Sequence, residues 1–208
     1  MKHKAVLTVG ILLFLIVFSA FAGAVNDGNT HFLSMTTSRM SPMDTFEKLN
    51  AGADYIFKGT CIESEPVFQN NTLYTLSKVE IQAVFKGDLE AGDTAFLLET
   101  GGRTTAGRYR EECHVKIKEG YADGDIIVVD LDGLYPLQKG ETALLFAVDS
   151  SGFLEDVEEP VYSVAGDYEG KFFLQEDGAY RRPLSDDEKL IGFEGIAITE
   201  DMLRQAEE

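Results

Sequence analysis

The residue types that this sequence has in short supply narrow the functions it can perform. It contains no tryptophan, only 2 cysteines and only 3 histidines. Zinc and copper sites need clustered cysteine and histidine ligands, so the sequence predicts neither. His114 is the histidine expected in an ordered region, and its neighbour Cys113 would point to the opposite face of a strand. Without a Gly-x-Ser-x-Gly elbow or a glycine-rich phosphate loop, no catalytic site is predicted.

Basic residues are also scarce. The chain has 18 lysines and arginines against 36 aspartates and glutamates, which gives a net charge of −18. Such a surface repels nucleic acids and anionic lipids, so we expect no nucleic-acid partner. The acidic surface suits cations, cationic partners or simple solubility.

The only long stretch without charge lies at the N-terminus. Met1 to Lys4 is basic, residues 5–25 carry no charge, and Ala22-Gly23-Ala24 places alanine at both small positions. These three features are typical of a secretory signal that is cleaved after Ala24. The apolar run also approaches the roughly 20 residues that span a bilayer, so an uncut signal-anchor helix is the alternative. Residues 1–24 therefore predict a secreted or extracytoplasmic protein, anchored through residues 5–25 if they are retained.

Polar residues dominate the next part of the chain, and residues 25–40 are expected to form a flexible tether. A short helix should follow, because Ser41 can cap it, Pro42 suits its first position and Gly52 can end it. A final helix over residues 200–206 is predicted after the capping residue Thr199.

Strands are expected between these helices. After a loop at Pro66, apolar and polar residues alternate up to Lys86, which is typical of a half-buried strand. The apolar members are Val79, Ile81, Ala83 and Phe85. Turns at Gly87-Asp88 and Gly92-Asp93 indicate an antiparallel meander. Residues 41–208 are therefore predicted as one mostly β domain with short flanking helices.

A long insertion with its own hairpin is expected at about residues 101–139, where the alternation weakens. Arginine and tyrosine, which are enriched at interfaces, gather there. The candidate partner-binding residues are Arg103, Arg108, Arg110, Tyr109, Tyr121 and Tyr135. The alternative is that the arginines form local salt bridges with the acidic body.

Two further groups of residues suggest chemistry. Cys61 and Cys113 are either a disulfide, which the chain-entropy model values at roughly 4 kcal/mol, or two buried thiols. Four aspartates of the insertion are candidates for calcium ligands; they are Asp123, Asp125, Asp130 and Asp132. Their Asp-Gly pairs are far more often turns than calcium ligands. No other cofactor is expected.

The sequence also resembles a known group of proteins. The segments that carry the likeness are Val84-Phe85-Lys86-Gly87-Asp88, Gly101-Gly102, Pro136 to Glu141 before Ala143-Leu144-Leu145-Phe146, and Gly166 to Phe172. Over Ala53 to Phe173 the chain is similar to exported bacterial domains of unassigned function and, more distantly, to the netrin-like domain of tissue inhibitors of metalloproteinases. The resemblance implies an OB-type antiparallel β-barrel of about five strands. Those inhibitors use an N-terminal cysteine on the protease's zinc; none precedes Cys61, so inhibition is not implied.

The function expected from the sequence is that of a non-catalytic, extracytoplasmic binding or interaction module. Its partner would be a protein or an envelope polymer, and it would meet a membrane only through its N-terminal segment. An envelope-associated hydrolase with a carboxylate site and a purely structural envelope component are the alternatives.

Overall fold

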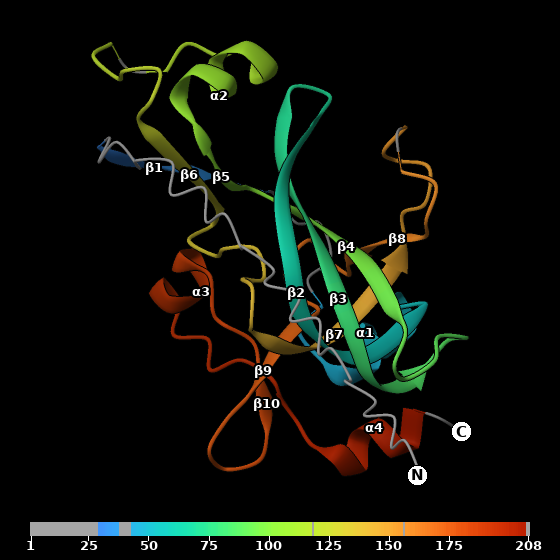
Figure 1. Ribbon diagram of the computed structural model, residues 1–208. Helices are drawn as coiled ribbons and strands as arrows, with labels where there is room; N and C mark the ends of the chain where they lie inside the picture. The colour runs from blue at the N-terminus through green and yellow to red at the C-terminus, as the bar shows by residue number, and fades with distance from the viewer. Residues whose placement is uncertain (1–28, 38–42, 118, 156, 207–208) are drawn as a thin grey trace, which may run out of the picture.

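The computed structural model describes residues 29–37, 43–117, 119–155 and 157–206, and it is mostly β (Figure 1). The large sheet has eight strands in the order β11-β10-β9-β7-β2-β3-β4-β8. These are β2 (Tyr55–Gln69), β3 (Thr72–Lys86), β4 (Thr94–Thr100), β7 (Thr142–Asp149), β8 (Val161–Val164), β9 (Lys171–Leu174), β10 (Tyr180–Arg181) and β11 (Ala197–Ile198). The predicted mostly β class is confirmed.

Five strands of this sheet form a closed ring of hydrogen-bonded pairs. β2 pairs with β3, β3 with β4, β4 with β8, β8 with β7, and β7 returns to β2. The β4–β8 pair is parallel and the other four are antiparallel. Val79 and Ile81 of the predicted alternating strand are buried inside, together with Phe57 and Leu145.

β2 and β3 form a long hairpin that the sequence pattern did not reveal. Asn70 and Asn71 make its two-residue turn with φ of 50° and 59°. Both angles are positive, as a type I′ turn requires, and asparagine tolerates them. β2 runs straight through Pro66, where a loop was predicted.

A second, three-stranded sheet lies beside the turn of this hairpin, in the order β1-β6-β5. Its strands are β1 (Thr30–Met35), β5 (Gly102–Thr105) and β6 (Ile126–Leu131). β1 falls in the segment predicted as a flexible tether, and the structure shows a strand there instead. It is ordered because Leu33 and Met35 pack against the core cluster formed by Leu73, Ile127 and their neighbours.

Four short helices complete the described chain: α1 (Phe46–Gly52), α2 (Ala106–Cys113), α3 (Asp186–Leu190) and α4 (Glu200–Ala206). α1 begins at Phe46 with Thr45 as its cap, later than predicted. Ser41 and Pro42, which were predicted to start it, lie outside the described residues. The α4 prediction is confirmed, with the Met202 N–H donating to Thr199 Oγ1 at 3.4 Å.

The insertion differs from its prediction. β5 and β6 do pair antiparallel, but helix α2 lies between them in the sequence, so the insertion is not a simple hairpin. Among the described helices, none has both the length and the apolar character needed to cross a membrane. The predicted signal or anchor, residues 1–24, lies outside the described residues.

Candidate functional site

A groove of about 1030 Å³ lies between the small sheet, the outer half of the β2–β3 hairpin and the segment that leads into α3. The groove forms because β1, β5 and β6 make a separate sheet, which is not hydrogen-bonded to the closed set of five strands. Its lining is mostly apolar, with a few charged side chains around it. A cavity of this size and character is typical of ligand sites.

One wall of the groove is the outer face of the small sheet. Phe32 on β1, Val128 on β6 and Arg103 on β5 are register partners and form a row across the three strands. All three line the groove, and Phe32 is 65% exposed. Alternation along β1 explains this, since its other face packs inward and leaves Phe32 outside.

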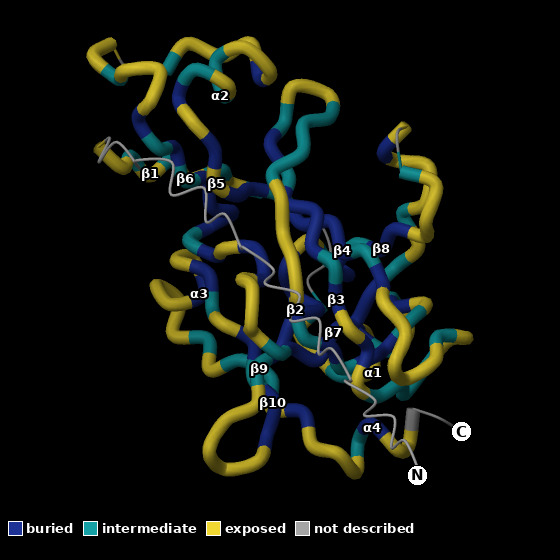
Figure 2. The backbone as a smooth tube through the Cα atoms, in the orientation of Figure 1, coloured by how far each residue is buried: buried dark blue, intermediate teal, exposed yellow. Residues whose placement is uncertain are grey.

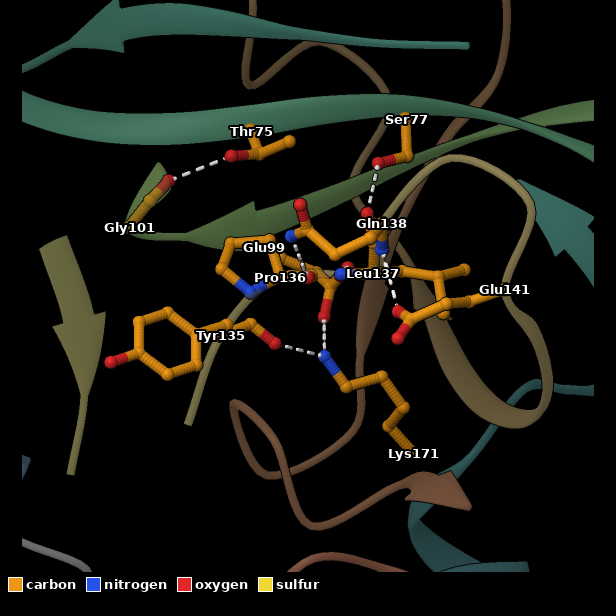
Figure 3. A network of polar contacts seen from close by, with 10 residues as sticks. All are labelled: Thr75, Ser77, Glu99, Gly101, Tyr135, Pro136, Leu137, Gln138, Glu141 and Lys171. Carbon is orange, nitrogen blue, oxygen red and sulfur yellow. Dashed lines mark hydrogen bonds and ion pairs between the residues drawn. The ribbon is translucent and has the colours of Figure 1, made fainter. Parts of the chain in front are cut away.

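Residues 134–136 and Gln138 supply another part of the lining, and polar contacts hold this segment in place (Figure 3). Lys171 Nζ donates to the Tyr135 carbonyl at 2.7 Å, and the Leu137 N–H donates to Glu99 Oε2 at 2.7 Å. The Gln138 N–H donates to Glu141 Oε2 at 2.7 Å. The ring of Tyr135 is left 45% exposed at the groove.

Lys171 and Glu99 also form an ion pair at 2.5 Å, with side chains that are 3% and 5% exposed. Buried charges are costly unless they are paired and hydrogen-bonded. Here each partner has a second contact in the segment 135–137. The pair therefore positions the groove lining, and the charges of Lys171 and Glu99 neutralise each other.

The structure brings only two of the six predicted partner-binding residues, Arg103 and Tyr135, to the groove. Arg108 lies 4.8 Å over the ring of Phe68. The other arginine of α2, Arg110, donates to Asp123 and to the Tyr121 carbonyl. Arg110 thus matches the alternative of a local salt bridge, whereas Arg108 packs over an aromatic ring.

Tyr109 and Tyr121 pack against the core cluster of the small sheet. Tyr121 also stacks on His31, with ring centroids 3.6 Å apart. His31, which was assigned to the tether, places Nε2 3.0 Å from Asp125 Oδ2. The hydrogen bond from His31 is the main cause that lowers the pKa of Asp125. No local sequence signal links these residues, because parallel pairing of β1 with β6 brings them together.

The four candidate calcium ligands serve separate contacts. Asp130 accepts from Ser34 Oγ at 2.6 Å and Asp132 from the Thr37 N–H at 3.4 Å, while Asp125 and Asp123 bind His31 and Arg110. Within the described residues, no three carboxylate, histidine or cysteine groups cluster as metal ligands would. Calcium binding stays a prediction.

The two cysteines are free and buried in this structure, so the predicted disulfide is not formed. Cys61 lies in the core of the closed set of strands, whereas Cys113 lies in the core of the small sheet. Burial raises the pKa of both thiols. The structure thus agrees with the alternative prediction, two buried free thiols.

No protein-family model matches this chain, and no curated protein matches it.

Proposed function

We propose that this protein is a non-catalytic, extracytoplasmic binding module and that its ligand occupies the groove between the two sheets. The groove is the observation that supports the proposal. Its volume, about 1030 Å³, is close to the upper limit of about 1000 Å³ for ordinary ligand sites. It presents two exposed aromatic side chains, Phe32 and Tyr135, a residue type that often anchors partners.

The proposed architecture is an OB-type barrel built from β2, β3, β4, β8 and β7. The closed pairing of these strands, with one parallel pair between β4 and β8, supports it. Partners of OB-type barrels dock on a strand face and on the loops beside it. The groove has this location, since it adjoins the β2–β3 face and the segment 134–138.

The proposed location outside the cytoplasm is based on the apolar residues 5–25 and their basic flank. The acidic composition argues against nucleic acid as the ligand. A protein or an envelope polymer is the proposed partner class.

Position-specific crosslinking tests the proposal in intact cells. A photo-crosslinking amino acid replaces Phe32 or Tyr135 in the full-length chain, and a matched control carries it at Val115, which is 39% exposed and outside the groove. We expect both groove positions to give the same adduct and Val115 to give none. The proposal fails if neither groove position gives an adduct, or if Val115 gives the same one.

A further inference from the structure

Among the residues that the structure describes, the half of β2 that leads to the hairpin turn has a strand partner on one side only. Residues 56–60 pair with both β3 and β7, whereas residues 63–69 pair with β3 alone. Ser64, Glu65 and Pro66 of this half line the groove. Figure 2 shows the exposed stretch of β2, which includes residues 62–65. A free strand edge beside a cavity is the arrangement in which a peptide can add to a sheet.

The hairpin register determines which backbone groups this edge presents. Gln69 and Thr72 flank the two-residue turn and therefore form a hydrogen-bonded pair. Hydrogen-bonded and non-hydrogen-bonded pairs alternate from this pair back along β2. In a non-hydrogen-bonded pair, the backbone N–H and C=O groups point away from the partner strand. The outward-facing residues of β2 are Phe68, Pro66 and Ser64. In agreement, Leu73, the partner of Phe68, uses its carbonyl to accept from the Gly101 N–H at 2.9 Å.

These outward groups are open to a ligand. The register turns the Ser64 N–H away from β3, and the pairing of β2 with β7 ends at Thr60. Pro66 has no N–H, and at an outward position it removes no bond to β3. Proline also protects an edge from indiscriminate pairing. A bound strand must therefore take a register that needs no donor at Pro66.

The charges around the groove indicate what the bound strand carries. Its two lysines are paired, Lys171 with Glu99 and Lys189 with Asp186. Arg103 is exposed and makes no ion pair with any described residue, although the chain has 36 acidic residues. An acidic side chain of the ligand would complement Arg103. A basic side chain of the ligand would instead pair with Glu65 or Glu141, which are exposed on the β2 side of the groove.

We propose that the ligand is an extended peptide segment of a partner protein, which adds as a strand to the outer edge of β2. Its alternate apolar side chains pack against Phe32 and Tyr135, and an acidic residue pairs with Arg103. The inference rests on the proposed function, because it names the ligand class of the same groove.

Peptide selection on the full-length protein provides the probe. Random peptides are displayed on phage and selected, and an enriched peptide is synthesised and titrated by fluorescence polarisation. Ser64→Pro should weaken binding about tenfold because one backbone donor is lost. Ser64→Ala, the matched control that keeps the N–H, should bind like the unmodified protein. Arg103→Glu should weaken binding, and a peptide whose acidic residue is replaced by lysine should restore it.

A second measurement leaves the protein unchanged, in case Ser64→Pro lowers the melting temperature. N-methylation of the peptide backbone should abolish binding at one set of alternate positions and have no effect at the other. Equal affinities for all N-methylated peptides would overturn the strand addition. A selection that enriches no peptide would overturn it as well. The crosslinking at Phe32 tests the proposed function separately, because it records a polysaccharide as readily as a protein.

Discussion

Lys171 and Glu99 lie beneath the groove as a buried ion pair whose partners also hold the segment 135–137. Lys171→Met should lower the free energy of unfolding by about 3–5 kcal/mol, because it leaves the Glu99 carboxylate buried without its cation. Adding Glu99→Gln should recover part of this loss, since the neutral amide still accepts from the Leu137 N–H. Chemical denaturation of both variants measures the difference. Equal losses in the single and double variants would show that the pair is not electrostatically coupled.

Residue roles were predictable only where local sequence determines them. Thr199 caps α4 as expected, because a capping side chain acts within three residues of its own position. Arg103 and Arg108 looked equivalent in the sequence, yet one lines the groove and the other covers Phe68. Their difference depends on where β5 ends and α2 begins. His31 gave no signal, since its partner Asp125 is reached through strand pairing.

At the level of elements, the β2–β3 hairpin depends on a turn with positive φ at both Asn70 and Asn71. Asn71→Gly should keep or slightly raise stability, because Asn-Gly is the preferred pair for this turn. Asn71→Val should lower the free energy of unfolding by about 1–3 kcal/mol, because a β-branched residue is strained at positive φ. Thermal unfolding of the two variants checks this. A valine variant as stable as the glycine variant would show that the turn has changed its geometry.

The elements that the sequence predicted well are those with regular alternation. β3 was recognised from Val79 and Ile81, because burial on one face imposes period two. β1 was missed because it is short and because Phe32, an apolar residue on its exposed face, breaks the alternation of apolar and polar residues. β2 was interrupted at Pro66 in the prediction, since proline is tolerated only where its missing N–H faces away from the ladder. That condition is a property of the sheet and cannot be seen in β2 alone.

For the whole molecule, the mostly β class followed from composition and turn spacing, but the division into two sheets did not. The small sheet depends on pairing β1 with β6 over a separation of 96 residues, a long-range contact without a local signature. The groove exists only because of that division. Sequence could therefore indicate Arg103 and Tyr135 as candidates but not the Phe32–Val128–Arg103 row that faces β2.

The two sheets also have separate cores, and each core contains one free thiol: Cys61 among the closed set of strands and Cys113 in the small sheet. Regions with less buried apolar contact open more often than the rest of a protein. The core of the small sheet has five buried members against twelve around Cys61. We therefore expect iodoacetamide to modify Cys113 faster than Cys61 in the native protein, when each rate is divided by its rate in denaturant.

A variant in the small sheet separates local opening from global unfolding. Asp125 binds His31 of β1 at 3.0 Å and also accepts from the Ala122 N–H at 2.9 Å. Asp125→Asn weakens the attachment of β1 without touching the other core, so it should raise the modification rate of Cys113 and leave that of Cys61 unchanged. Mass spectrometry of the modified peptides gives both rates from one sample. If the two thiols react at one common rate in both proteins, the sheets unfold as a single cooperative unit, and the groove between them is as rigid as the core.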